Sequence, residues 1–155
     1  MSLGQIIPLI EFNDILIVRM ANESQLDWMR RLPKRQEGIW EPNMIYSFGL
    51  LQRKDTLFFL YNDHRFNHLD ENPSILKQYG GGETANLLVR VTKDGQVDKF
   101  NISRKISPQK RLAVHPRRSW QLDDNQVLLY AEAPGQSITS GMFFTMNWEE
   151  LLHKN

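Results

Sequence analysis

The sequence contains no cysteine, and it carries almost no excess of either charge. The absence of cysteine excludes disulfide bonds, thiol catalysis and thiolate-bound metals. The chain has 19 Lys and Arg residues against 18 Asp and Glu residues, a net charge of +1. Such a balance argues against a dedicated polyanion-binding domain, so we expect no nucleic-acid partner. No apolar run approaches the ~20 residues that a membrane-spanning helix needs, so we also expect no membrane span.

Hydrophobic residues make up 41% of the 155 residues, close to the fraction in ordinary globular proteins. We therefore expect one β-rich domain over residues 1–155, and we expect it to be a fragment of a larger protein. The N-terminal residues lead directly into an apolar segment and lack the basic region and cleavage site of a secretory signal. The compartment stays open, because a parent protein could be secreted or periplasmic.

Short, unbroken apolar runs edged by turn residues dominate the chain. They are rich in β-branched and aromatic residues, as strands are. The clearest hairpin joins Leu87–Val91 to Gln96–Ile102, because Asp94-Gly95 supplies the positive φ that such a turn needs. Three more antiparallel pairs are expected: Asp14–Met20 with Leu26–Leu32, Tyr46–Gln52 with Thr56–Tyr61, and Ser119–Leu122 with Gln126–Ala131.

The unbroken runs predict strands that are buried on both faces, since a strand with one wet face alternates apolar and polar residues. We expect this of Leu57–Tyr61, Leu87–Val89 and Val127–Tyr130. Helices cannot cover these strands, because only Trp148–His153 and Pro73–Gln78 have helical character. Sheets must then cover sheets. The expected fold is all-β, with antiparallel hairpin units that resemble β-propeller blades, and the alternative is a β-sandwich.

Several motifs resemble a group of uncharacterised bacterial propeller-like proteins. These motifs are Asp14–Arg19, Trp28, Leu32–Gln36, Leu57–Asp63 and Val91–Gly95. The proteins of this group repeat a strand, a turn and a second strand that ends in a Trp and a Pro-Lys pair. The resemblance implies the C-terminal portion of a larger propeller-like protein. It implies no catalytic residues, because none is assigned to the group.

The sharpest polar cluster is the segment Asn62–Glu71, which contains Asp63, His64, His68 and Asp70. Imidazole and carboxylate groups could bind a divalent metal. However, a histidine spacing of four places both rings on one face only in a helix, and this segment follows a strand. We therefore expect a polar, ligand-contacting loop, with no metal and no cofactor.

A second cluster is basic. The segment Lys99–Ser119 contains no acidic residue and includes Arg117 and Arg118. Such a patch could contact phosphates, but it lacks the interleaved aromatic residues that stack on single-stranded nucleic acid. We expect a solvated basic loop that is open to an acidic partner.

These features favour a non-catalytic binding or structural module over an enzyme, because no nucleophile motif is present. The loops Phe66–Gly82 and Ser103–Arg118 are expected to form the contact surface for a protein or carbohydrate ligand. The alternative is a carbohydrate-active or other hydrolase-associated domain. Uncovered sheet flanks also predict self-association, most simply as a homodimer. The candidate ligand-binding residues are Asp63, His64, His68, Asp70, Arg117 and Arg118.

Overall fold

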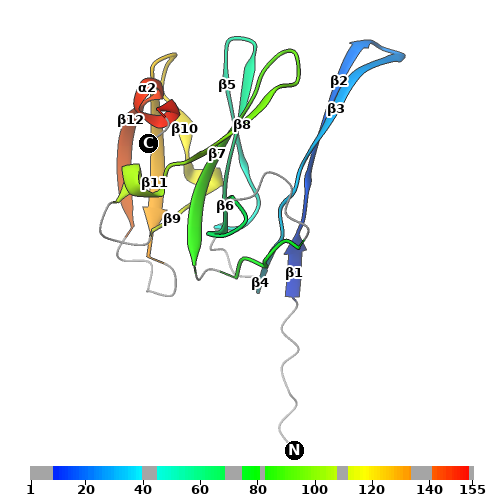
Figure 1. The fold of residues 1–155 in the computed structure, drawn as a ribbon. Helices are drawn as coiled ribbons and strands as arrows, with labels where there is room; N and C mark the ends of the chain where they lie inside the picture. Colours follow the sequence, from blue (N-terminus) through cyan, green and yellow to red (C-terminus); the bar gives the residue numbers. More distant parts are fainter. Residues whose placement is uncertain are drawn as a thin grey trace, which may run out of the picture.

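The computed structural model describes residues 9–39, 45–68, 75–80, 83–107, 112–133 and 141–153. These residues form antiparallel β-sheets with only a few short helices, which confirms the all-β prediction at that level. Figure 1 shows three layers side by side: a long two-stranded ribbon, a central sheet and an outer sheet. No helix among the described residues is long and apolar enough to cross a membrane.

The ribbon layer is built from two consecutive pairs of short strands. At its tip, β2 (Ile15–Asn22) pairs with β3 (Gln25–Leu32), which confirms the predicted pairing of Asp14–Met20 with Leu26–Leu32. At its base, β1 (Leu9–Phe12) pairs with β4 (Gln36–Ile39). The ribbon runs along one face of the central sheet (Figure 1).

The central sheet is a four-stranded meander in the order β5-β6-β7-β8. Two tight turns set its register. Lys54 (φ 52°) lies between β5 (Gly49–Arg53) and β6 (Thr56–His64), and Gly95 (φ 79°) lies between β7 and β8. The Asp94-Gly95 turn therefore adopts the backbone that the sequence predicts. The bounds of the last two strands are Thr84–Val91 for β7 and Val97–Asn101 for β8.

The outer sheet surrounds β11 (Gln126–Glu132). Strand β12 (Met142–Asn147) pairs with β11, and so do the two short strands β9 (Ala113–Val114) and β10 (Trp120–Gln121). Strand β12 is followed by α2 (Trp148–Leu152), which confirms the predicted C-terminal helix.

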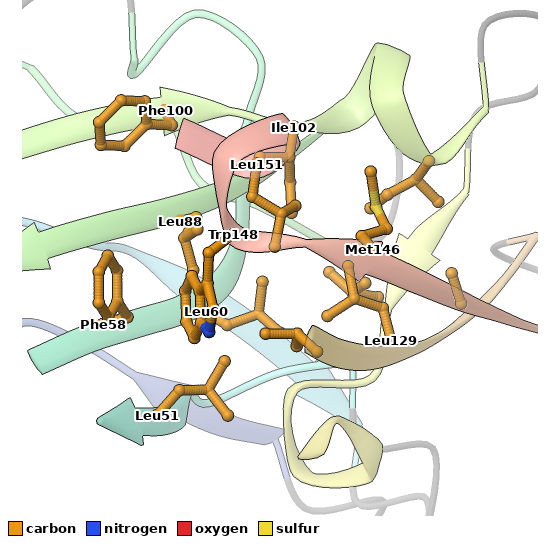
Figure 2. Packing of buried hydrophobic residues seen from close by; sticks show 14 of the residues in the cluster. Leu51, Phe58, Leu60, Leu88, Phe100, Ile102, Leu129, Met146, Trp148 and Leu151 are labelled. Atoms are coloured by element: carbon orange, nitrogen blue, oxygen red, sulfur yellow. The ribbon is translucent and has the colours of Figure 1, made fainter. Parts of the chain in front are cut away.

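Two hydrophobic clusters hold the three layers together. The larger one joins the central sheet to the outer sheet, and within it Trp148 packs on Phe58 with ring centroids 4.4 Å apart (Figure 2). The smaller one joins the opposite face of the central sheet to the ribbon through Ile15, Ile17 and Leu32. Sheets therefore cover the central sheet on both faces, as the unbroken apolar runs predict.

Three expectations about individual segments need correction. In Val127–Tyr130 only Leu128 is half-buried, so the face that carries Leu128 and Tyr130 is covered in part, whereas Leu57–Tyr61 and Leu87–Val89 are covered almost entirely on both faces. The segment Ser103–Arg118 is not one long loop. Its described residues include α1 (Ser103–Ile106), β9 and a 3₁₀ turn, η1 (Pro116–Arg118). The described part of Pro73–Gln78, residues 75–78, is not helical.

Candidate functional site

The candidate site lies where β6 ends and β7 begins. His64 and Thr84 are paired neighbours at this end of the central sheet. The chain leaves β6 through a turn closed by the Asn67 backbone N–H, which donates to the His64 carbonyl oxygen at 2.9 Å. The polar cluster seen in the sequence therefore follows a strand, as expected, and its described residues form a structured turn.

Asp63 lies beneath this turn, and only 2% of its surface is exposed. Its carboxylate accepts hydrogen bonds from Asn67 Nδ2 at 2.7 Å and from the His64 backbone N–H at 2.8 Å. Burial raises the pKa of the Asp63 carboxyl to about 6, although these hydrogen bonds and the charges of Lys99 and Lys34 act in the opposite direction. Asp63 is therefore a buried structural acceptor with a weakened preference for the charged form.

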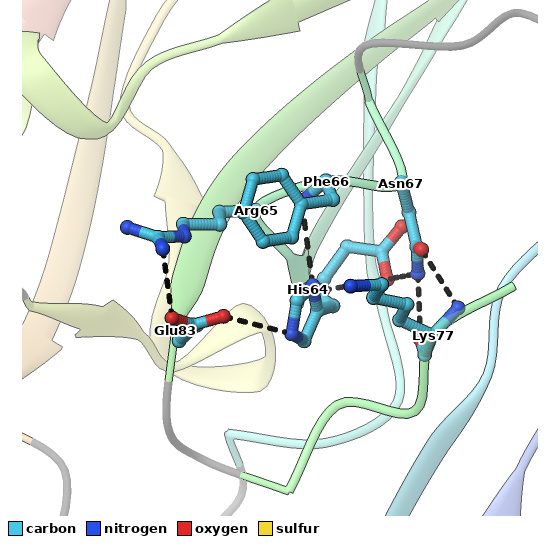
Figure 3. A network of polar contacts seen from close by, with 7 residues as sticks. His64, Arg65, Phe66, Asn67, Lys77 and Glu83 are labelled. Atoms are coloured by element: carbon cyan, nitrogen blue, oxygen red, sulfur yellow. Dashed lines mark hydrogen bonds and ion pairs between the residues drawn. The ribbon is translucent and has the colours of Figure 1, made fainter.

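His64 belongs to a polar network on the exposed side of the turn. Its Nε2 lies 3.1 Å from one carboxylate oxygen of Glu83, and the Arg65 guanidinium lies 2.8 Å from the other oxygen (Figure 3). The Phe66 ring lies under two cations, with Arg65 Cζ and Lys77 Nζ each 4.6 Å from its centroid. These contacts bring both sides of the β6–β7 connection together.

Asn67 fixes the returning segment to the turn. Its Nδ2 donates to the Lys77 carbonyl oxygen at 2.7 Å, and its Oδ1 accepts the Lys77 backbone N–H at 2.9 Å (Figure 3). The paired bonds resemble those of an antiparallel strand, so one side chain holds two segments that are ten residues apart. The turn is thereby held in place by its own polar groups.

His68 contacts the end of β8. Its Nε2 lies 3.0 Å from Asn101 Nδ2, and an amide nitrogen only donates, so the ring nitrogen accepts. Burial lowers the pKa of His68, and the Lys99 charge lowers it further, which favours the neutral ring. Asp70 lies outside the described residues. Within the described part of the chain, no three His, Asp or Glu side chains gather as metal ligands.

A cleft of about 570 Å³ opens beside His68. It lies at the edge of the central sheet, where β8 gives way to α1 and the end of α2 comes near. The lining residues carry positive charges or neutral hydrogen-bonding groups, together with one aromatic ring. They are His68, Thr84, Lys99, Phe100, Asn101, Ser103, Arg104 and His153.

Arg117 and Arg118 do not belong to this cleft. Both lie in η1, beside the outer sheet, where the Arg118 guanidinium lies 5.5 Å from the centroid of the Tyr130 ring. Of the sequence candidates, the structure brings Asp63 and His64 into one network and His68 into the adjacent cleft. The five cleft residues from Lys99 to Arg104 were not among the sequence candidates, although all of them lie in the acid-free segment. No sequence signal pointed to His153.

Comparison of the chain with protein-family models, with curated proteins and with solved structures gave no match. The resemblance to propeller-like proteins therefore stays a prediction from the sequence.

Proposed function

We propose that the chain is a non-catalytic binding module in which propeller-like stacked sheets present the His64–Thr84 end of the central sheet to a protein or carbohydrate ligand. The layered arrangement supports the propeller-like part of this proposal. A two-layer sandwich covers each sheet on one face, whereas the central sheet here is covered on both faces. Successive antiparallel units also follow one another through the layers in chain order.

The observation that carries the binding function is the contrast between the polar network and the cleft beside it. Asp63 is buried, and both carboxylate oxygens of Glu83 are engaged by His64 and Arg65. A general acid or base must reach the substrate within hydrogen-bonding distance, and these carboxylates are held in structural contacts instead. The open cleft offers cations and hydrogen-bond donors on a structured frame, an arrangement suited to recognition.

One observation favours the alternative, a carbohydrate-active enzyme. A carboxyl group with a pKa near 6 is suited to donate a proton at neutral pH, and Asp63 has this property beside His64. In that function, Asp63 would become accessible when the turn of residues 65–68 above it opened. The two proposals differ in the expected effect of Asp63→Asn, which would abolish turnover in an enzyme and spare ligand binding in a module.

The test pairs a glycan array with hydrolysis assays on the same full chain. We expect saturable binding without turnover, and binding weakened about tenfold or more by Asn101→Ala. Glu23→Gln serves as the control, because Glu23 is exposed in the distant β2–β3 turn. Hydrolysis that disappears in Asp63→Asn would replace the proposal with the enzyme. Affinity capture of protein partners, with the Asn101→Ala variant as the control, completes the test. If the wild type binds neither a glycan nor a protein that the variant fails to bind, the binding-module proposal is overturned.

A further inference from the structure

The cleft has a charge character that points to one class of ligand. Its lining contains the cations Lys99 and Arg104, and no acidic residue among those the structure describes. The chain as a whole is nearly neutral, with a net charge of +1, so such one-sided lining is a local property. Resting on the proposed function, we propose that this cleft binds an anionic group, a carboxylate, sulfate or phosphate carried by the ligand.

Lys99 and Arg104 supply the charge from two different elements. Lys99 lies on the edge strand β8, and Arg104 lies in α1, only a few residues further on. Among the described residues, no acidic side chain forms an ion pair with either of them. The charge of Lys99 lowers the pKa of the Asp63 carboxyl, but Asp63 is buried and does not line the cleft. Both cations are thus available to a ligand.

Neutral donors between the two cations complete the site. Ser103 Oγ accepts the Asn86 backbone N–H at 2.9 Å, which leaves the hydroxyl proton to donate. The Asn101 side chain accepts the Ser103 backbone N–H at 3.0 Å through Oδ1 and holds His68 through Nδ2. Hydrogen bonds between ionised and neutral groups are about twice as strong as those between neutral groups, so an oxyanion gains from both kinds of partner.

Lys105, unlike its neighbour Arg104, bonds to backbone carbonyl groups at the end of α2. Its Nζ donates to the carbonyl oxygens of Glu150 at 2.6 Å and Leu151 at 3.2 Å, and also to that of His153. The Lys105 side chain therefore ties α1 to the C-terminal end of α2 and keeps His153 at the cleft wall. The volume of about 570 Å³ lies within the usual range for small-ligand sites and suits a single acidic sugar or a similar group.

The full chain is titrated with small anions at constant ionic strength, and the NMR chemical shifts of its backbone amides are measured at each step. The probes are inorganic phosphate, sulfate and glucuronate, with glucose as the neutral counterpart of glucuronate. We expect saturable shifts at Lys99, Asn101, Ser103 and Arg104 with at least one anion and none with glucose. Saturation by glucuronate alone identifies an acidic sugar as the ligand class, and saturation by phosphate or sulfate alone identifies an esterified group.

The double variant Lys99→Gln/Arg104→Gln should weaken anion binding at least tenfold. Arg117→Gln/Arg118→Gln is the matched control, because it removes two exposed positive charges outside the cleft and should leave binding unchanged. If both variants weaken anion binding equally, or if the chemical shifts never saturate, the anion-site proposal is overturned. The anions would then be attracted by the overall charge of the protein and not by this cleft. The proposed function survives that result if neutral glycans or proteins still bind in the array and Asn101→Ala weakens them.

Discussion

Asn62 and Asn86 face each other across β6 and β7, and the amide oxygens of both accept the backbone N–H of Val114. The distances are 3.1 Å and 3.0 Å. Their amide nitrogens donate in turn, from Asn62 to the carbonyl oxygens of Ile45 and Val114 and from Asn86 to that of Leu112. Two buried side chains thereby bind β9 of the outer sheet to the central sheet.

This relationship predicts that Asn62→Ala lowers the free energy of unfolding by about 2–3 kcal/mol, because it leaves buried backbone groups without a partner. Urea unfolding followed by circular dichroism measures the loss. Asn125→Ala is the control: Asn125 lies in an exposed turn, and its replacement should change stability by less than about 0.5 kcal/mol. Similar losses in both variants would contradict the structural role of Asn62.

The core predicts unequal effects of two truncations. Phe59 is 4% exposed between the central sheet and the ribbon, whereas Leu128 is half-buried on the outer sheet. Phe59→Ala should cost on the order of 3–5 kcal/mol, and Leu128→Ala should cost less than about 2 kcal/mol. Thermal melts of both variants check the order. Equal losses would mean that Leu128 is fully covered in solution, whereas the structure covers it only in part.

Asp63 predicts a stabilising substitution. Its pKa is raised from 3.8 to about 6 in the folded state, so the wild type loses stability as the pH rises from about 4 to above 6. Asp63→Asn lacks this loss and can still accept hydrogen bonds from Asn67 and His64. It should be more stable than the wild type by up to about 3 kcal/mol at pH 8, and this gain should shrink at pH 5 and vanish near pH 4.

Urea unfolding of the two proteins at these three pH values measures the difference. The control is Asp94→Asn, because Asp94 is fully exposed in the β7–β8 turn and its pKa is lowered by a hydrogen bond from Thr92. That substitution should not stabilise the protein at pH 8. An Asp63→Asn difference that stays constant from pH 8 to pH 4 would contradict the raised pKa.

His115 predicts the opposite slope. The ring is 1% exposed, and its Nε2 lies 2.8 Å from a Glu132 carboxylate oxygen. Burial lowers the pKa of His115 more than Glu132 raises it. The folded state therefore binds fewer protons than the unfolded state, and stability should fall as the pH drops below 6.5. His115→Gln should remove this slope, although the variant starts from a lower stability.

The comparison uses unfolding free energies at pH 8, 7, 6 and 5, and the quantity of interest is the difference between His115→Gln and the wild type. That difference should narrow as the pH falls. Asn125→Ala serves as the reference, because it removes an exposed side chain that does not titrate and should give a curve parallel to that of the wild type. Parallel curves for His115→Gln would show that the buried ring does not resist protonation.

The outer face of the β2–β3 ribbon predicts self-association. Val18 and Met29 are paired neighbours on this face, and they are 50% and 53% exposed. Large apolar patches are rare on monomeric proteins. Light scattering at micromolar concentration should therefore report a dimer, and Val18→Lys/Met29→Glu should give a monomer. A well-folded, strictly monomeric wild type would count against the fragment hypothesis and favour a closed sandwich. The other exposed apolar residues of the ribbon are Leu16, Met20 and Leu26.

The four hairpins were predictable because each depends on local information: two apolar runs and the turn between them. Strand β4, strand β9 and α1 were not predictable in this way. Strand β9 has two residues, and Asn62 and Asn86 hold it through bonds to groups far away in the sequence. Such elements exist because of tertiary contacts, which no local pattern records.

The site shows the same division. The sequence singled out His64 and His68 by their spacing, but the turn after β6 directs the two rings to different partners, Glu83 and Asn101. The acid-free segment correctly marked a basic region. It could not show that Lys99 and Arg104 meet His68 from another strand end, or that Arg117 and Arg118 lie elsewhere.

The β2–β3 ribbon also determines how the molecule opens. Among the described strands, β2 and β3 pair only with each other. Side chains hold the ribbon to the β7–β8 turn: Trp28 Nε1 and the Arg19 guanidinium donate to the Lys93 carbonyl oxygen. Arg30 Nε donates to the Gly95 carbonyl oxygen. The amide protons of the ribbon should therefore exchange with solvent through partial opening, well before those of β6 and β7. When the ribbon detaches, the apolar face of the central sheet around Phe59 is transiently exposed to solvent. By covering this face in the folded state, the ribbon protects the protein from aggregation through the central sheet.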